Sequence, residues 1–410
     1  MEPILVAGAG HAGMQLADSL RAEGFSAPIT LVNNEIGMPY QRPPLSKDFL
    51  TAGSNPQYLP LKSWKFFIDN DIELIEGDPI IGIDRSRRSV QLANGNTLTY
   101  SDLVLATGAR NRTLGVAGVE LEGVHYLRTA TDAARLHSAL VDAETTVVVG
   151  AGFIGLEFAA VARARGLDVT VIEHGSRPMA RAVSEEMSRF FADAHSAAGI
   201  QFVFNEDVTA LDGDGSQVSG VLTRSGKRYK ADLVLIGIGV EPNTELATTA
   251  DLTTTRGIDV DTYLRTDDEH IWAIGDCTYF PCRFAERQTR RESVQNAVDQ
   301  ARALARTLTG IPTEYLEVPW FWSHQGTHKL QIAGLANHSD STVIHGDPLS
   351  GKFSIFCFRA DSLTCVESIN SPGVHIAARR VLASGALPSV SDVTADGFDL
   401  KDYAKRIPAV

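Results

Sequence analysis

The chain has 410 residues, of which 44% are hydrophobic, so it can form a core for two or three domains and is not expected to be disordered. Its formal net charge of −13 argues against nonspecific binding to nucleic acid or to an anionic membrane. Because no apolar run is long enough to span a bilayer and no charged segment precedes the first apolar run, we expect a soluble, cytoplasmic protein.

The first 35 residues have the pattern of a dinucleotide-binding unit. "ILVAGAGHAG" predicts a strand and a glycine turn, "MQLADSLRAEG" predicts the following helix, and "PITLV" predicts a second strand. Gly8 would make the tight turn, Gly10 would let the backbone approach a pyrophosphate, and Gly13 would let the helix pack on the strand. The helix N-terminus would face the phosphate charge.

Residues 145–173 repeat this pattern with Gly150, Gly152 and Gly155. A strand precedes this second turn, a helix follows it, and "DVTVIE" predicts the next strand. A second unit of this kind in the middle of a chain indicates that the protein binds two dinucleotides.

The residue that ends the second strand of each unit helps to distinguish the cofactors. Glu173 in the second unit can accept both ribose hydroxyls of NADH and would repel the 2′-phosphate of NADPH, so NADH is favoured. Three neighbouring cations are alternative phosphate ligands: His174, Arg177 and Arg181. In the first unit, either Asn34 or Glu35 could bind the ribose, and the sequence does not choose between them.

The rest of the chain completes an α/β pattern. "LVLATGAR", "LVLIGIGVEPN" and "IWAIGDC" indicate strands that end in glycine turns, and residues 290–308 predict a helix. From residue 319 the pattern becomes strands followed by one helix. We therefore expect two Rossmann-like dinucleotide-binding domains and a small α+β C-terminal domain.

With these turns in place, the segments "RPPLSK" (42–47), "ESVQNAVDQAR" (292–302), "PWFWS" (319–323) and "KLQIAGL" (329–335) carry a family resemblance over the whole chain. The sequence resembles the FAD-dependent NADH:ferredoxin reductases of oxygenase electron-transfer systems, the putidaredoxin reductase and biphenyl dioxygenase reductase type. The resemblance implies a glutathione-reductase-like fold. It places an FAD-binding domain at 1–110 and 240–318, an NADH-binding domain at 111–239, and the C-terminal domain at 319–410.

The same resemblance assigns cofactor-binding residues. For FAD it indicates Gly8, Gly10, Ala12, Gly13, Asn34, Glu35, Arg42, Lys47, Ile80, Ala106, Arg128, Asp276, Val294 and Trp320. For NADH it indicates Gly150, Gly152, Ile154, Gly155, Glu157, Glu173, Arg181 and Gly237. Asn34 stands where relatives usually carry an acid. No metal site is expected.

The family chemistry is hydride transfer from NADH to FAD, followed by release of single electrons to an iron–sulfur ferredoxin that serves an oxygenase. Lys47, Glu157 and Trp320 would be the catalytic residues beside the flavin. Two of them have structural alternatives, because an acid is favoured in a first helical turn and a tryptophan is often core. His324 replaces a common aspartate, either as a titrating group or as a neutral variation.

The segment "PYQRPPLSKDFL" (39–50) would hold Lys47 toward the flavin. We expect Pro43 and Pro44 to keep the backbone extended and Ser46 to cap the helical turn that follows. The segment contains no cysteine where disulfide reductases carry their dithiol. A redox disulfide between Cys277 and Cys282 is therefore not expected.

An arginine cluster precedes the helix that would touch the flavin: Arg283, Arg287, Arg290 and Arg291. It could dock an acidic ferredoxin, or it could be solvated and paired with local carboxylates. Two other functions remain open on the same scaffold. One is an NADH oxidase or a monodehydroascorbate-type reductase, and the other is an NADH-responsive interaction module.

Overall fold

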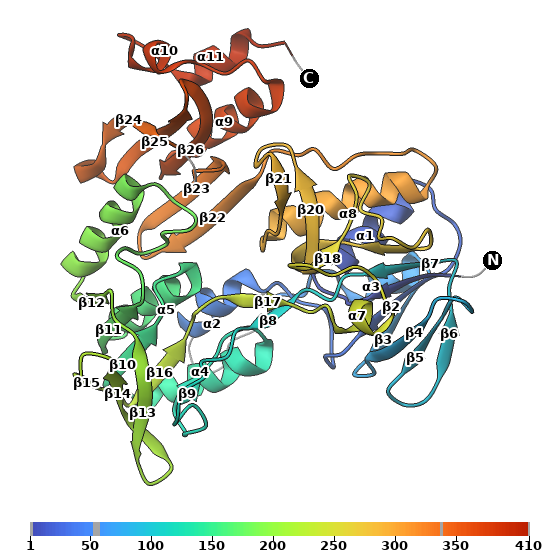
Figure 1. The fold of residues 1–410 in the computed structure, drawn as a ribbon, viewed down its shortest axis with the longest axis horizontal. Coiled ribbons are helices and arrows are strands. Elements are labelled where there is room, and N and C mark those ends of the chain that lie inside the picture. The colour runs from blue at the N-terminus through green and yellow to red at the C-terminus, as the bar shows by residue number, and fades with distance from the viewer. Residues whose placement is uncertain (1–2, 52–57, 337–338, 409–410) are drawn as a thin grey trace. The chain divides into compact units, whose positions relative to one another are not determined.

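The computed structural model describes residues 3–51, 58–336 and 339–408 (Figure 1). The chain divides into two compact units. Unit 1 contains Met1–Gln41, Tyr58–Arg110 and Glu241–Glu317. Unit 2 contains Arg42–Gln57, Asn111–Val240 and Val318–Val410. Each unit joins segments that are far apart in the sequence.

The centre of unit 1 is a five-stranded parallel sheet in the order β19-β7-β1-β2-β3. Its strands are β1 (Ile4–Ala7), β2 (Ile29–Asn33), β3 (Ile72–Glu76), β7 (Asp102–Leu105) and β19 (Ile271–Ala273). β1, β2 and β19 are buried along their whole length, which explains why they read as continuous apolar runs. Helices α1 (His11–Ala22) and α8 (Val294–Leu308) pack against each other.

Smaller elements complete unit 1. Two three-stranded sheets have the orders β4-β5-β6 and β18-β20-β21. Their strands are β4 (Ile80–Asp84), β5 (Ser89–Leu92), β6 (Thr97–Thr99), β18 (Ile258–Asp259), β20 (Thr278–Cys282) and β21 (Arg287–Thr289). The short helices are α3 (Trp64–Asp69), α7 (Glu245–Thr249) and the 3-10 turn η2 (Gly275–Cys277).

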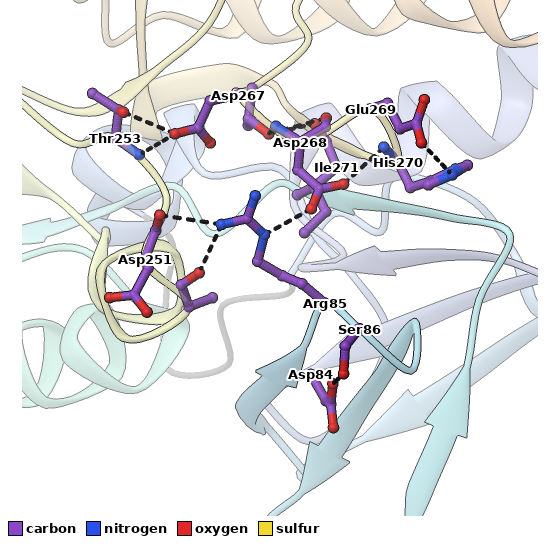
Figure 2. Close-up of polar contacts among 12 residues, drawn as sticks. Asp84, Arg85, Ser86, Asp251, Thr253, Asp267, Asp268, Glu269, His270 and Ile271 are labelled. Carbon is purple, nitrogen blue, oxygen red and sulfur yellow. Dashed lines mark hydrogen bonds and ion pairs between the residues drawn. The ribbon is translucent and has the colours of Figure 1, made fainter.

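Arg85 fixes the β4-β5-β6 sheet within unit 1 (Figure 2). Its Nε lies 2.7 Å from Oδ2 of Asp268, and its Nη1 donates to the carbonyl oxygens of Ala250 and Asp251. One side chain that follows β4 thereby holds both the end of the α7 segment and the turn before β19. β4 begins at Ile80, one of the residues expected to bind FAD.

Unit 2 contains a second five-stranded parallel sheet, in the order β12-β11-β10-β16-β9. Its strands are β9 (Val124–His125), β10 (Thr145–Val149), β11 (Asp168–Glu173), β12 (Ile200–Phe204) and β16 (Leu233–Ile236). The helices are α4 (Ala130–Asp142), α5 (Phe153–Ala164) and α6 (Glu185–Ala197). A separate antiparallel sheet contains β13 (Val208–Asp214), β14 (Gln217–Thr223) and β15 (Arg228–Lys230).

The C-terminal part of unit 2 is an antiparallel sheet in the order β22-β23-β26-β25-β24, with α9 lying against it (Figure 1). The strands are β22 (Trp320–Gln325), β23 (His328–Gly334), β24 (Ser341–Asp347), β25 (Lys352–Arg359) and β26 (Ser362–Ile369). The helices are η3 (Pro348–Ser350), α9 (Pro372–Ser384), α10 (Val390–Thr394) and α11 (Leu400–Arg406). The expected α/β class, with two parallel sheets and a separate α+β part, is confirmed.

The proline segment differs from its prediction. Pro43 and Pro44 do not continue an extended backbone but begin the 3-10 helix η1 (Pro43–Ser46), which α2 (Asp48–Thr51) follows. A proline ring fixes φ near −65°, which fits the first turn of a helix as well as an extended chain, and the missing N–H is not needed there. The extended-arm prediction was therefore wrong, although the prolines still restrict the backbone before Lys47.

Two remaining strands, β8 (Ala109–Asn111) and β17 (Val240–Pro242), pair with each other, and the division between the units falls within both. Among the residues that the structure describes, no helix has the length and apolar character needed to cross a membrane.

Candidate functional site

The first glycine turn lies where the strand order of the unit 1 sheet reverses. The chain proceeds from β1 to β2 on one side and later adds β7 on the other, so the crevice between the carboxyl ends of β1 and β7 is a topological switch point. Gly8 follows β1 with φ +117°, and a Cβ on it would lie 2.3 Å from the carbonyl oxygen of Ala106. A Cβ on Gly13 would lie 2.0 Å from the carbonyl oxygen of Gly8.

The second glycine turn repeats this geometry in unit 2. There the order reverses between β10 and β16, and Gly150 has φ +100°. A Cβ on Gly150 would lie 2.6 Å from the carbonyl oxygen of Gly237, and one on Gly155 would lie 2.3 Å from that of Gly150. A Cβ on Gly237 would lie 3.6 Å from backbone atoms of Gly155, which is an ordinary contact. Close backbone packing, rather than turn composition alone, therefore requires glycine at positions 150 and 155.

The middle glycine of each turn is different, because its surroundings are open. Apart from its chain neighbours, no described residue would come within 4 Å of a Cβ on Gly10, and among the same residues a Cβ on Gly152 would meet only the carbonyl oxygen of Gly237, at 3.9 Å. Helices α1 and α5 begin at the next residues, His11 and Phe153. Open space beside backbone N–H groups at a helix N-terminus fits a pyrophosphate, so the residues present fit a dinucleotide at each turn.

Other expected FAD residues lie near the first turn. Ala106 directly follows β7, and Ile80 is buried at the start of β4. Asp276 is half-buried in η2, where the preceding Gly275 approaches Ala12. Val294 begins α8.

The two candidates for the ribose contact in unit 1 differ in their environment. Asn34 is exposed after β2. Glu35 is half-buried, and its Oε2 accepts a hydrogen bond of 2.5 Å from the hydroxyl of Tyr40. Both remain candidates.

Glu173 is tied to the glycine turn of unit 2. Its Oε2 accepts from the backbone N–H of Ala151 at 2.7 Å, and its Oε1 accepts from that of Gly175 at 2.7 Å. The neighbouring cations differ in their hydrogen-bond partners and in their exposure. His174 lies 2.5 Å from Asp207, whereas Arg177 donates to backbone oxygens and to Ser188. Arg181 is exposed near Gly239, and Ile154 is 43% exposed on the first turn of α5.

Lys47 and Glu157 form a direct ion pair within unit 2. Lys47 Nζ lies 2.6 Å from Oε2 of Glu157, whose side chain is only 3% exposed. Glu157 follows the third glycine of the turn by two residues and lies in the first turns of α5. The structure therefore brings together the two predicted catalytic residues that are 110 positions apart in the sequence.

Trp320 lies on β22, and its side chain is on the opposite face of this strand from the Lys47–Glu157 pair. Alternate side chains of a strand point to opposite faces. The Phe321 ring packs at a tilt against Phe153 of α5 and Ser323 contacts Glu157, whereas Trp320 lies beside α9. The guanidinium of Arg379 lies 4.5 Å from the centroid of the Trp320 ring.

The remaining expected FAD residues of unit 2 also have polar contacts. Arg42 Nη1 donates to the carbonyl oxygen of Arg128 at 2.7 Å. His324 is exposed on β22, and partial burial together with the charge of Lys47 lowers its pKa. The expected FAD residues are thus divided between unit 1 and unit 2.

The sequence prediction assigned Ser46 a capping role and gave Ser323 and Gln325 none. The Ser46 hydroxyl donates to Oε2 of Glu157 at 2.5 Å, and the Ser323 hydroxyl donates to Oε1 at 2.6 Å. Gln325 in turn donates to Ser323. The only available signal was the run of polar residues Ser-His-Gln after three aromatic residues of the strand, which does not identify a partner in α5.

The four members of the arginine cluster differ in their exposure. Arg283 and Arg287 are exposed. Arg290 pairs with Glu292 at 2.7 Å and donates to the carbonyl oxygen of Arg256, and Arg291 contacts the sulfur of Cys282. Cys277 and Cys282 are both buried free thiols that form no disulfide, and burial raises the pKa of the Cys277 thiol. Within the described part of the chain, no cluster of acidic, histidine or cysteine side chains is arranged to hold a metal ion.

Comparison with known proteins gives two family matches. The model described as "Pyridine nucleotide-disulphide oxidoreductase" matches residues 2–301, and the model described as "Reductase C-terminal" matches residues 320–404. A rhodocoxin reductase from Rhodococcus erythropolis is 50% identical over 399 residues, which is 97% of this chain and 93% of the relative.

Two solved structures are similar over nearly their whole length. The ferredoxin reductase for the CYP199A2 system from Rhodopseudomonas palustris has a TM-score of 0.96 and 46% identity, covering 98% of this chain and 100% of that chain. A chain of the covalent putidaredoxin reductase–putidaredoxin complex has a TM-score of 0.93 and 33% identity, and the match covers 99% of this chain and 99% of that chain.

Proposed function

Because this chain belongs to the pyridine nucleotide-disulphide oxidoreductase family, we propose that it is a ferredoxin reductase that delivers electrons from NADH to an iron–sulfur ferredoxin serving an oxygenase. It is an FAD-containing oxidoreductase that uses NADH. Bound FAD accepts two electrons as a hydride and releases them singly, which matches a two-electron donor to a one-electron carrier.

The duplicated glycine turn carries this proposal. One turn lies in each unit, each lies at a reversal of strand order, and each has open space beside its middle glycine. An enzyme that moves electrons from one dinucleotide to another needs two such sites. We assign FAD to Gly8–Gly13 of unit 1 and NADH to Gly150–Gly155 of unit 2, as the resemblance implies.

Lys47 and Glu157 are proposed to act in the step that uses NADH. Their ion pair lies on the helix that the NADH turn opens, so it is close to the predicted nicotinamide cofactor within unit 2. A lysine held there stabilises negative charge that develops during reduction. Glu157 fixes the lysine and compensates its charge.

For the partner, we propose that an acidic ferredoxin docks on Arg283 and Arg287, the exposed members of the arginine cluster. Arg290 and Arg291 are half-buried, and each is tied to a neighbouring side chain, Arg290 to Glu292 and Arg291 to Cys282. A basic surface on a protein of net charge −13 would steer an acidic partner to one place.

Alanine substitutions of the two middle glycines test the cofactor assignments separately. Neither glycine has a positive φ, and neither would clash with protein atoms as alanine, so the fold should be retained. Gly10→Ala should lower the FAD content of the purified protein. Gly152→Ala should retain FAD and raise KM for NADH, by about tenfold for a displacement below 1 Å. Gly82→Ala and Gly115→Ala, which are also unobstructed, are the matched controls.

The overall activity is tested with NADH, a panel of ferredoxins and cytochrome c as the final acceptor. We expect cytochrome c reduction to require both NADH and a ferredoxin. Rapid oxygen consumption that no ferredoxin accelerates would instead support an NADH oxidase.

A further inference from the structure

We propose that Ser323 and Ser46 are positioning residues for Glu157, and that Gln325 and His195 extend them into a buried chain of hydrogen bonds directed at that carboxylate. This inference rests on the proposed role of the Lys47–Glu157 pair in the reaction with NADH. It assigns that pair a supporting structure that comes from three other parts of unit 2: η1, β22 and α6.

The first step concerns the carboxylate itself. Oε2 of Glu157 receives Lys47 Nζ at 2.6 Å and the Ser46 hydroxyl at 2.5 Å, and Oε1 receives the Ser323 hydroxyl at 2.6 Å. Burial of a carboxylate is costly unless donors compensate the lost hydration, and here both oxygens have short partners. Because the partners approach from different elements, they fix the rotation of the carboxylate as well as its position.

The second step concerns what holds Ser323. Gln325 Nε2 donates to the Ser323 hydroxyl at 3.2 Å and contacts the sulfur of Met179 at 3.5 Å. Since the hydroxyl of Ser323 accepts from Gln325, its own hydrogen is directed to Glu157. Gln325 and Ser323 are both fully buried, so water does not compete for these bonds.

The third step fixes the direction of the chain. The amide oxygen of Gln325 lies 2.8 Å from Nε2 of His195, so Nε2 of this imidazole must carry a hydrogen. Burial lowers the pKa of His195, which is consistent with a neutral ring. Every donor in the sequence His195, Gln325, Ser323 then points toward Glu157, and aligned hydrogen bonds of this kind polarise one another.

Strand alternation explains why this arrangement can form. Phe321, Ser323 and Gln325 occupy alternate positions of β22 and share the face that meets Phe153 and Glu157 of α5 and His195 of α6. The aromatic residue packs at one end and the polar residues reach the carboxylate and the histidine. The C-terminal sheet therefore contributes to the surroundings of Glu157 through its edge strand β22.

The test removes one hydroxyl and measures reduction of the bound flavin by NADH in a single turnover. Ser323→Ala should slow this step by about tenfold to a hundredfold, because Glu157 loses the partner that orients it. KM for NADH should change less than this rate, since Ser323 reaches the predicted NADH residues through Glu157. Ser323→Thr keeps the hydroxyl and should restore most of the rate, which a purely structural role would not require.

Ser354→Ala is the matched control. Ser354 is also a buried serine of the C-terminal sheet, but its hydroxyl donates to Ser368 at 3.1 Å. If Ser323→Ala does not fold with FAD, Ser46→Ala carries the same test on the other carboxylate oxygen. Equal rates for the Ser323→Ala and Ser354→Ala proteins would overturn the proposal, and a wild-type rate for Gln325→Leu would overturn the extended chain.

A double-mutant cycle with Lys47→Ala separates this inference from the proposed function. If Ser323 acts through Glu157 on Lys47, the two substitutions should be less than additive in the rate of flavin reduction. A slow Ser323→Ala protein combined with a Lys47→Ala protein of normal rate would contradict it. None of these measurements uses a ferredoxin, so failure to reduce any ferredoxin would count against the proposed function alone.

Discussion

Glu173 has one observed and one proposed role at the Gly150–Gly155 turn, and the two roles predict different effects. Its carboxylate already accepts from Ala151 and Gly175, so it shapes the turn. Its remaining lone pairs are proposed to receive the ribose hydroxyls of NADH, and its charge would repel a 2′-phosphate. Of the three cations nearby, Arg177 is already bound to several protein oxygens and His174 lies against Asp207. Arg181 is therefore the best-placed group to receive a phosphate.

We predict that Glu173→Gln narrows the preference for NADH over NADPH by about tenfold, measured as the ratio of kcat/KM values. The ratio of the kcat/KM values is the useful quantity, because loss of one oxygen acceptor will also disturb the turn and weaken the binding of both NADH and NADPH. Asp168→Asn, on the same strand but 88% exposed, is the control for a lost charge. An unchanged ratio would remove the carboxylate from cofactor selection.

Individual residues show how much of the site could be predicted from the sequence. The spacing of Gly8, Gly10 and Gly13 predicted a glycine turn between a strand and a helix, and the structure has this turn between β1 and α1. The contact between Ser323 and Glu157 joins positions 166 residues apart, and a buried serine has no compositional signature. The prediction for Pro43 was wrong because its fixed φ suits both an extended backbone and the first turn of a helix, and only the packing around η1 selects the helical turn.

At the level of elements, β26 and α6 are joined by a buried carboxylate. Glu367 on β26 is fully buried, and both of its oxygens accept from Ser184, one from the backbone N–H at 2.9 Å and one from the hydroxyl at 2.5 Å. Ser184 is the N-cap of α6. Burial raises the pKa of Glu367 from 4.5 to about 7, with Glu186 adding to the rise, while the Ser184 bonds and Arg177 oppose it.

The sign of the resulting pH dependence follows from proton uptake. Between pH 4.5 and about 7, folded Glu367 holds a proton that the unfolded chain releases. The free energy of unfolding should therefore fall as the pH rises through this window, by at most about 3 kcal/mol. Glu367→Gln stays neutral, so its melting temperature relative to the wild type should increase from pH 5 to pH 8. Glu185→Gln, exposed on the same helix, should show no such trend. A constant difference between Glu367→Gln and the wild type across this range would contradict the prediction.

At the scale of the whole molecule, the distribution of charge matters more for ferredoxin binding than the net charge does. A net charge of −13 repels an acidic ferredoxin at long range, so a productive encounter depends on a local basic surface. Salt screens both the repulsion and the attraction over about 8 Å at physiological ionic strength. Arg283 lies in the turn between β20 and β21, 4.7 Å from the centroid of the Phe284 ring, and Arg287 is on β21, so both belong to one hairpin.

We predict that Arg283→Glu combined with Arg287→Glu raises the apparent KM for ferredoxin by about tenfold or more, because charge reversal turns local attraction into repulsion. The salt dependence of ferredoxin reduction should weaken in the same protein. Reduction of ferricyanide by NADH should keep its rate, since this small acceptor needs no docking surface. Arg87→Glu combined with Arg189→Glu makes the same change in net charge on exposed positions elsewhere. If this control pair raises KM equally, the net charge of the molecule rather than the arginine cluster governs ferredoxin binding.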